Sequence, residues 1–182
     1  MSSFFENPFI EGNLCFAFGN NSAGATRYET WHCHLHVFQQ LKKKAVDFIY
    51  SAPEVKTLFF TEVKDFEAIT QIGKYKLGAF SLELANDMAQ KFRESLDGFS
   101  MAKDVSENIL ERNFSLENDQ KSKVAILHWE MHKDFDEQKR KHYIRLMIRK
   151  LDELLLDVFS RVSVENIEDN PSKYLTVSRI GE

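Results

Sequence analysis

Hydrophobic and polar residues along the middle of the chain form a pattern that predicts two neighbouring strands. The first apolar run spans residues 45–50 and the second spans residues 57–65, and both are rich in β-branched and aromatic side chains. Pro53 interrupts the short segment between them, so the pattern predicts a strand–turn–strand unit. Because side chains alternate between faces along a strand, Glu62 and Lys64 are expected on one face of the second strand.

A pattern with helical spacing follows these strands. Phe80, Leu84, Met88 and Phe92 recur every four residues, which predicts a long amphipathic helix packed on the sheet. It is expected to begin near residue 69 or 76 and to end at Asp97-Gly98. The other predicted elements are strands at 14–18, 123–130 and 175–180, helices at 104–112 and 136–159, and an ambiguous helix or strand at 27–40. This order predicts an α/β fold with helices packed on a mixed sheet.

The composition is typical of a folded protein. The chain has 182 residues, of which 43% are hydrophobic and sixteen are phenylalanine, so one domain over residues 1–182 can bury a substantial core. No apolar run reaches the length of a membrane span, and the start lacks the apolar stretch of a secretory signal. Cys15 and Cys33 make no disulfide framework, so a cytoplasmic location without a membrane partner is expected.

Charged residues at the ends of the two predicted strands point to metal chemistry. If Asp47 pairs opposite the end of the second strand, its carboxylate meets that of Glu62 and the ammonium of Lys64. Mg²⁺ and similar hard cations prefer oxygen ligands and keep several waters, so one or two carboxylates can anchor them. The carbonyl of Val63 is a candidate third ligand, and the lysine could orient or deprotonate an attacking water.

These residues carry a resemblance to a known family. Asp47, a spacer of fourteen residues and then Glu62-Val63-Lys64 resembles the core motif of the PD-(D/E)XK, or restriction-endonuclease-like, nuclease superfamily. In that family the Asp opens the second core strand, the Glu-x-Lys closes the third, and a helix follows. The family's proline is missing here, because Val46 precedes Asp47. The resemblance covers about residues 28–130, and leaves a C-terminal helix and tail at 136–182 outside it.

The resemblance implies a restriction-endonuclease-like core with a central four-stranded mixed sheet, and a metal-dependent nuclease that hydrolyses phosphodiester bonds. DNA is favoured over RNA as the substrate. Asp47, Glu62 and the Val63 carbonyl would bind Mg²⁺ or Mn²⁺, and Lys64 would position or activate the water. The alternative function is a catalytically inactive protein of the same fold that binds protein or nucleic acid. A homodimer is compatible with either function.

Further residues are candidates because of the same resemblance. Gln71 and Tyr75 look like the Gln-x-x-x-Tyr signature of the RecB-like branch, and on a helix residues four apart share a face. The alternative is an ordinary helix start, with Gln71 exposed and Tyr75 in the core. Glu29, before the core sheet, is a candidate accessory carboxylate for the metal, or else an isolated surface residue.

A histidine cluster offers a different metal site. On a strand, His32, His34 and His36 would share a face and could bind zinc, whereas on a helix only His32 and His36 would align. No Cys-x-x-Cys or distant histidine pair completes a zinc pattern, so a structural or substrate-facing role is favoured.

The net charge of −4 does not indicate nucleic-acid binding, which would depend on local positive surface. Lys42-Lys43-Lys44 lies just before Asp47, and Lys141, Arg145 and Arg149 form a stripe on the predicted C-terminal helix. The stripe could follow a row of phosphates, or it could be a solvated face paired with nearby carboxylates.

Overall fold

The computed structural model describes residues 4–19, 24–66, 78–169 and 175–181, and its architecture is α/β. The elements of the N-terminal part are β1 (Phe9–Glu11), β2 (Leu14–Phe18), β3 (Ala25–Arg27), η1 (Tyr28–Thr30), η2 (His34–Phe38), β4 (Phe48–Ala52), η3 (Pro53–Val55) and β5 (Thr57–Asp65). Those of the C-terminal part are α1 (Leu82–Val105), α2 (Ile109–Asn118), β6 (Ser122–Glu130), α3 (Glu137–Leu155), β7 (Arg161–Glu165) and β8 (Leu175–Arg179).

A mixed five-stranded sheet lies at the centre of this structure, with the strand order β3-β4-β5-β6-β7. Strands β3, β4 and β5 are antiparallel neighbours, whereas β6 is parallel to β5 and β7 is parallel to β6. The difference follows from the connections, because an antiparallel pair needs only a short turn and a parallel pair needs a long crossover. Helices α1 and α2 connect β5 to β6, and α3 connects β6 to β7. The predicted α/β class with a mixed, helix-flanked sheet is confirmed, but the central sheet has five strands where the resemblance implied four.

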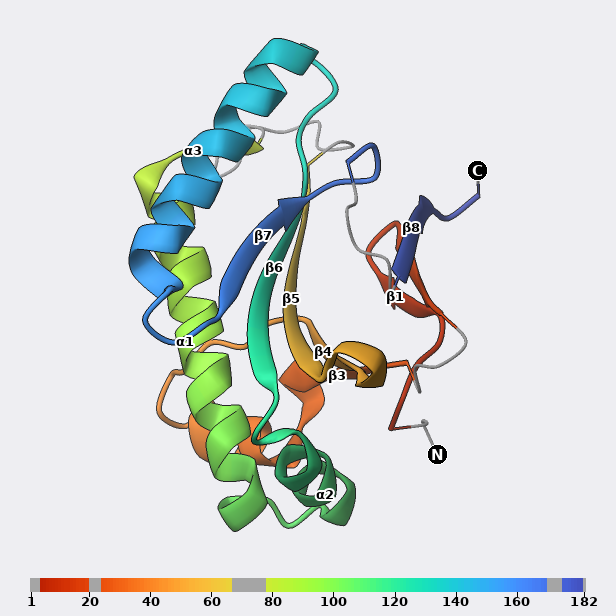
Figure 1. Cartoon of the computed structure of the whole chain (residues 1–182), viewed down its shortest axis with the longest axis vertical. Helices are drawn as coiled ribbons and strands as arrows, with labels where there is room; N and C mark the ends of the chain where they lie inside the picture. The colour runs from red at the N-terminus through yellow and green to blue at the C-terminus, as the bar shows by residue number, and fades with distance from the viewer. Residues whose placement is uncertain (1–3, 20–23, 67–77, 170–174, 182) are drawn as a thin grey trace.

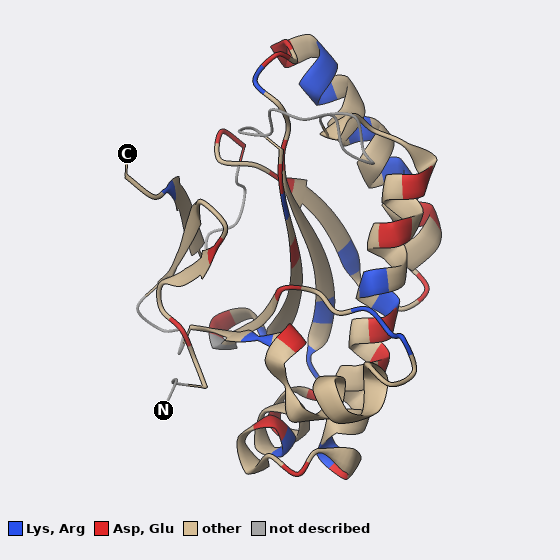
Figure 2. Cartoon of the chain, turned by 180° about the vertical axis from the view of Figure 1, so that it is seen from behind, with Lys and Arg blue, Asp and Glu red and all other residues tan. Residues whose placement is uncertain are grey.

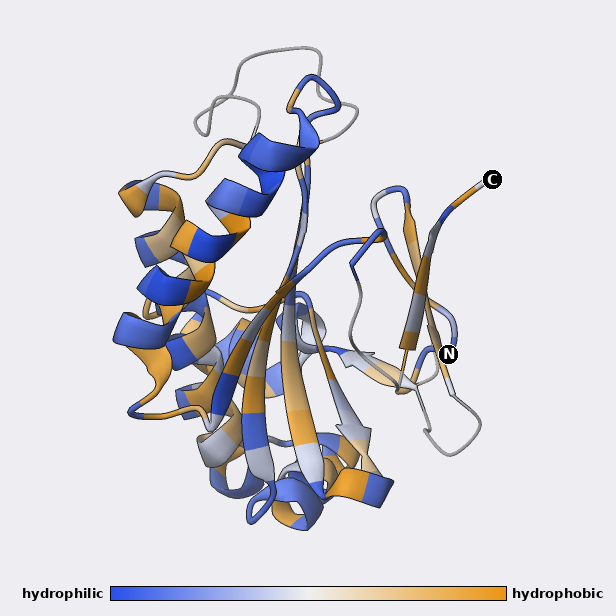
Figure 3. Ribbon diagram, turned by 45° about the horizontal axis from the view of Figure 1, so that its top comes forward, coloured by the Kyte–Doolittle hydropathy of each residue, from blue (hydrophilic) through white to orange (hydrophobic). Residues whose placement is uncertain are grey.

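Different structures cover the two faces of the sheet. Helices α1 and α3 lie on one face, and the small antiparallel sheet β1-β2-β8 lies on the other (Figure 1). Strands covered on both faces need apolar residues on both, and Figure 3 shows the hydrophobic residues that run along the central strands. This double burial explains why residues 45–50 and 57–65 read as nearly continuous apolar runs.

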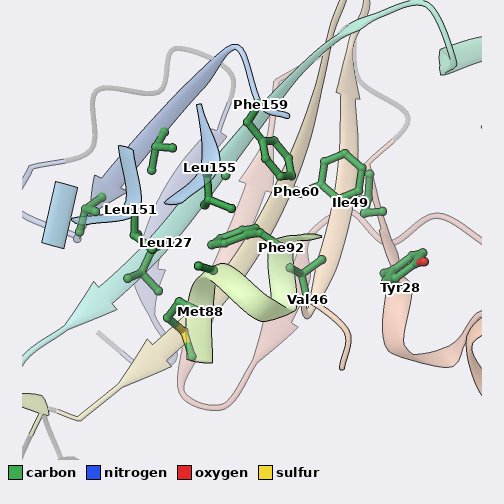
Figure 4. Close-up of a cluster of buried hydrophobic side chains, with 14 of the residues drawn as sticks. Tyr28, Val46, Ile49, Phe60, Met88, Phe92, Leu127, Leu151, Leu155 and Phe159 are labelled. Atoms are coloured by element: carbon green, nitrogen blue, oxygen red, sulfur yellow. The ribbon is translucent and has the colours of Figure 1, made fainter. Parts of the chain in front are cut away.

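The core on the helical side combines side chains from both helices and the sheet. Figure 4 shows this cluster, which includes Met88, Phe92, Leu151, Leu155, Phe60 and Leu127. Each of these side chains is almost fully buried, and burial of one such side chain contributes about 1.5–3 kcal/mol. The predicted packing of the Leu84–Met88–Phe92 stripe on the sheet is confirmed. A second apolar cluster joins the two sheets, where the rings of Phe16 and Phe48 lie 5.1 Å apart.

Helix α1 differs from its predicted bounds at both ends. Ser81 caps its start by accepting a hydrogen bond from the backbone N–H of Leu84 at 3.1 Å, so Phe80 lies outside the helix. The predicted stop at Asp97-Gly98 is wrong, because the helix continues to Val105. Gly98 is required for close packing instead, since a Cβ there would lie 2.2 Å from Oη of Tyr28. Glycine often ends a helix, but Gly98 lies inside α1 and allows close contact with Tyr28.

The predicted helix over residues 136–159 is too long at its C-terminal end. Asp136 caps its start by accepting from the N–H of Lys139 at 2.8 Å, but the helix ends at Leu155. The apolar pattern continues because Phe159 is buried beyond the helix, with its ring 5.5 Å from that of Phe60. Strand β7 follows directly, and the sequence pattern did not indicate it.

The remaining predicted elements agree in kind and shift in position. Strands were predicted at 14–18, 123–130 and 175–180, and they are β2, β6 and β8. The predicted helix at 104–112 is α2, which starts later because Asn108 is its cap. The ambiguous segment at 27–40 contains the short helical turns η1 and η2. Among the described helices, none combines the length and apolarity needed to cross a membrane.

Candidate active site

The pairing of β4 with β5 brings together the charged residues predicted from the sequence. Phe48 pairs with Thr61, so Asp47, the residue before β4, lies beside Glu62 near the end of β5. The backbone N–H of Val63 donates a hydrogen bond of 2.6 Å to Oδ2 of Asp47, which fixes this carboxylate against the strand. The predicted convergence of two carboxylates and the Lys64 ammonium is therefore present.

Glu62 is the centre of this group, and its side chain is completely buried. Its Oε1 accepts hydrogen bonds from Nζ of Lys64 and, at 2.6 Å, from Nζ of Lys91 on α1. No described residue supplies a hydrogen-bond partner to Oε2 of Glu62. A buried carboxylate oxygen is costly to leave without a partner, so this atom marks a place where a cation or a donor would bind.

Lys91 belongs to the site although the sequence pattern did not point to it. It lies seven residues after Leu84, so it is two turns further along the same face of α1, at the edge of the apolar stripe. A lysine on the inward edge of a buried helix face was the signal that could have found it. Burial lowers the pKa of Lys91, but the hydrogen-bonded Glu62 and the nearby Asp47 more than offset this effect, so that the pKa is raised.

The Asp47 carboxyl group has an unusual proton affinity. Burial and the neighbouring Glu62 carboxylate raise the pKa of Asp47 to about 7, although Lys91 and Lys64 lower it. Two carboxylates held this close repel each other unless a proton or a cation lies with them. The lysines offset only part of that repulsion.

This pKa predicts how stability depends on pH when divalent cations are removed. The folded protein keeps a proton on Asp47 that the unfolded chain releases, so stability falls as pH rises from about 4 to about 7. Asp47→Asn should remove this contribution, whose slope is at most about 1.4 kcal/mol per pH unit. The measurement is urea unfolding in EDTA across that pH range for both proteins. Parallel pH dependences of wild type and Asp47→Asn would contradict the raised pKa.

The donor set at this site suits a hard divalent cation. It offers the carboxylates of Asp47 and Glu62, and the carbonyl oxygen of Val63, which accepts a hydrogen bond from Nζ of Lys64 at 3.1 Å. Within the described ranges, no three His, Cys, Asp or Glu side chains are grouped so that they could hold a metal ion. A cation here would therefore complete its shell with water, as Mg²⁺ commonly does.

The supporting candidates from the sequence are not all at this site. Gln71 and Tyr75 lie outside the described residues. Glu29 is exposed and lies 3.6 Å from the guanidinium of Arg27, and its charge reaches the site only as one of the carboxylates that raise the pKa of Lys91. The structure therefore does not place Glu29 with Asp47 and Glu62 as a third grouped ligand.

The histidine cluster is divided by its local structure. The segment His34–Phe38 forms a single turn of π-helix rather than a strand, so the three histidines do not share one face. The rings of His32 and His36 lie 4.4 Å apart, while His34 is buried near Tyr28. The alternative of a zinc site built from all three on one strand is therefore wrong.

The lysines before β4 attach this segment to α1. Lys43 lies 3.7 Å from Asp97, and Lys44 lies 3.4 Å from Asp87, with both carboxylates on α1. These ion pairs give Lys43 and Lys44 a structural role. Lys42 is exposed to solvent.

The basic stripe on α3 is exposed as predicted. Lys141, Arg145 and Arg149 lie on the solvent side, and Figure 2 shows basic residues along α3, with the acidic residues near its two ends. Lys141 pairs with Glu137 at 2.5 Å, which matches the solvated-face alternative for that position. For Arg145 and Arg149, both predicted roles stay open, which are contact with a row of phosphates and a solvated face paired with carboxylates.

Comparison with known proteins gave no match among family models, curated proteins or solved structures. The fold and the site themselves therefore define the class of protein. It is an α/β protein with one buried carboxylate, one partly buried carboxylate and two lysines at one end of a mixed sheet.

Proposed function

We propose that the protein is a metal-dependent nuclease that hydrolyses phosphodiester bonds, with DNA favoured over RNA. The observation that carries this proposal is the meeting of Asp47, Glu62, Lys64 and Lys91 around a buried carboxylate oxygen that lacks a partner among the described residues. Charged groups are rarely buried in this way unless they are paired or bind a ligand.

The two carboxylates and the Val63 carbonyl would hold Mg²⁺ or Mn²⁺ in this proposal. A divalent cation supplies charge stabilisation at a phosphoryl oxygen and lowers the pKa of a bound water. Lys64 positions that water or balances charge on the phosphate, since its ammonium is partly exposed, with 23% of the side-chain surface accessible. Lys91 holds Oε1 of Glu62 from the helix side, which leaves Oε2 for the cation.

The topology supports a restriction-endonuclease-like core. That resemblance implies an Asp at the start of the second core strand, a Glu-x-Lys at the end of the third, and a helix after it. Here Asp47 precedes β4, the second of three antiparallel strands, and Glu62 and Lys64 lie near the end of β5. Helix α1 follows, and β6 adds to the sheet parallel to β5.

A cleavage assay tests the proposal directly. Purified protein is incubated with single-stranded and double-stranded DNA and RNA in Mg²⁺, in Mn²⁺ or in EDTA. Cleavage should require the metal, and Lys64→Ala should reduce its rate by about a hundredfold or more. Lys103→Ala is the matched control, because Lys103 forms an ion pair of 2.9 Å with Asp119 away from the site. Cleavage at the wild-type rate by folded Lys64→Ala would contradict the assigned role.

One observation favours a second candidate function, a catalytically inactive protein of this fold that binds a partner. Both lysines donate to the same oxygen of Glu62, so the cluster balances much of its own charge without a metal. A purely structural ion cluster would show neither cleavage nor Mn²⁺ binding in calorimetry. That combined result would replace the nuclease proposal with the binding function.

A further inference from the structure

A cavity of about 190 Å³ lies at the carboxyl ends of β6 and β7, beside the start of α3. Figure 1 shows these strand ends together at one edge of the sheet. The residues that line the cavity include Trp129 and Glu130 of β6, Arg140 of α3, Ile167 and Glu168 after β7, and Arg179 of β8. In open α/β sheets, ligands bind in crevices outside the carboxyl ends of the parallel strands.

Two hydrogen-bond donors of the cavity wall lack acceptors among the described residues. They are Nε1 of Trp129, whose residue is 1% exposed, and Nε of Arg140. The other tryptophan of the chain differs, because Nε1 of Trp31 donates to Oγ1 of Thr26 at 2.9 Å. Buried donors without acceptors cost about 1–3 kcal/mol each, so a ligand with acceptor oxygens would relieve both.

The carboxylates around the cavity are already engaged. Oε1 of Glu130 accepts from the backbone N–H of Ile167 at 2.7 Å and lies 2.8 Å from Nε2 of His128. Arg179 lies 3.2 Å from Asp65 and 3.9 Å from Glu130, so its charge is met within the protein.

Arg140 is in a different position from Arg179. The carboxylate nearest to it is that of Glu168, at 3.9 Å, and the Glu168 side chain is 76% exposed to water. The cavity therefore has one guanidinium charge that the protein balances only weakly. A ligand with a single negative charge would balance it, whereas a dianion would bring one negative charge more than Arg140 can balance.

The cavity is adjacent to the candidate active site. Lys64 and Trp129 are partners in the parallel pairing of β5 with β6, so their side chains point to the same face of the sheet. Neighbouring strands lie about 4.8 Å apart, which places the cavity wall next to the lysine assigned to the reaction. If a strand of nucleic acid is bound with one phosphodiester at Lys64, its neighbouring phosphodiester can reach this cavity.

We propose that this cavity binds a phosphodiester of the substrate strand next to the one that is cleaved. The inference rests on the proposed nuclease function and names Arg140 and Trp129 as the residues that hold the phosphate oxygens. A phosphodiester carries one negative charge and two acceptor oxygens, which matches both the charge of Arg140 and the two donors. Guanidinium groups bind phosphate through short, charge-assisted hydrogen bonds.

The test follows the indole N–H signals of ¹⁵N-labelled protein by nuclear magnetic resonance, with dimethyl phosphate as the probe. The chain has two tryptophans, and Trp129→Phe assigns their signals. Dimethyl phosphate should shift the Trp129 signal in a saturable way and leave that of Trp31 unchanged. Arg140→Gln should weaken this binding by about tenfold or more, whereas Arg145→Gln, on the exposed face of the same helix, should not.

The outcomes separate the cavity from the catalytic proposal, because the titration needs neither metal nor cleavage. No shift at Trp129, a shift insensitive to Arg140→Gln, or equal binding of acetate or inorganic phosphate would overturn the phosphodiester assignment. If dimethyl phosphate shifts the Trp129 signal but the protein cleaves no nucleic acid, phosphodiester binding in the cavity is supported and the nuclease proposal is contradicted. If the protein cleaves nucleic acid but the Trp129 signal does not shift, the nuclease proposal is supported and phosphodiester binding in the cavity is contradicted.

Discussion

Glu62→Gln is expected to lower metal-dependent cleavage by about a thousandfold or more while the chain still folds. Glutamine keeps the shape of the side chain but removes the negative charge that Lys64, Lys91 and a divalent cation need. The two lysine side chains are 23% and 24% exposed, so their ammonium groups can reach water when the carboxylate is gone. Initial cleavage rates at saturating Mg²⁺ measure the loss, and thermal unfolding checks the fold.

The matched control for this change is Glu165→Gln. Glu165 is also buried in the five-stranded sheet, with 1% of its surface exposed, and it accepts a hydrogen bond from Ser163 at 2.9 Å that glutamine can keep. Glu165→Gln should leave the cleavage rate within a few-fold of that of the wild type. If Glu62→Gln folds and cleaves as fast as Glu165→Gln, then Glu62 does not bind the metal.

Gly98→Ala should destabilise the folded protein by about 1–3 kcal/mol, although alanine is the better helix former. The added Cβ would lie 2.2 Å from Oη of Tyr28 and 3.2 Å from the ring of Phe38, so the helix or these rings must move. Oη of Tyr28 has no hydrogen-bond partner among the described residues, so Tyr28→Phe should itself cost little. Urea unfolding of the single variants measures both effects.

The double variant makes this prediction specific. Combining Gly98→Ala with Tyr28→Phe removes the closest contact and should recover part of the lost stability, with a coupling energy of about 1 kcal/mol. Recovery stays partial because the Phe38 ring is still close. Asn86→Ala, on the exposed face of the same helix, should be neutral or slightly stabilising. Additive effects of the two core changes would show that the Tyr28 contact is not the cause.

The fold was predictable from sequence where burial follows a regular period. The runs at 45–50 and 57–65 predicted β4 and β5, and the stripe through Leu84 predicted α1. The errors occur where a residue is required for a contact with a part of the chain that is distant in sequence. Gly98 resembles a helix stop but faces Tyr28, and Phe159 extends the helical period of α3 although it fills the core after the helix has ended.

The candidate site was predictable only in part, for a related reason. Asp47, Glu62 and Lys64 were accessible because they lie at the ends of adjacent strands, where pairing brings them together. Lys91 comes from a helix that crosses the sheet, and its approach to Glu62 depends on how α1 packs. Spacing along the chain shows that Lys91 borders the buried face of α1, but it does not show which part of the sheet that face meets, so the contact with Glu62 becomes visible only in the assembled fold.

The pairing of β2 with β8 has a consequence for how the protein is synthesised. Leu14 pairs with Arg179 and Phe18 with Leu175, so the two strands come from opposite ends of the sequence. A ribosome releases the N-terminal residues first, so β1 and β2 can pair early, but the other edge of β2 stays unpaired until residues 175–179 have been synthesised. An unpaired strand with buried-type side chains is prone to aggregate. The small sheet is therefore the layer whose completion comes last as the chain is synthesised.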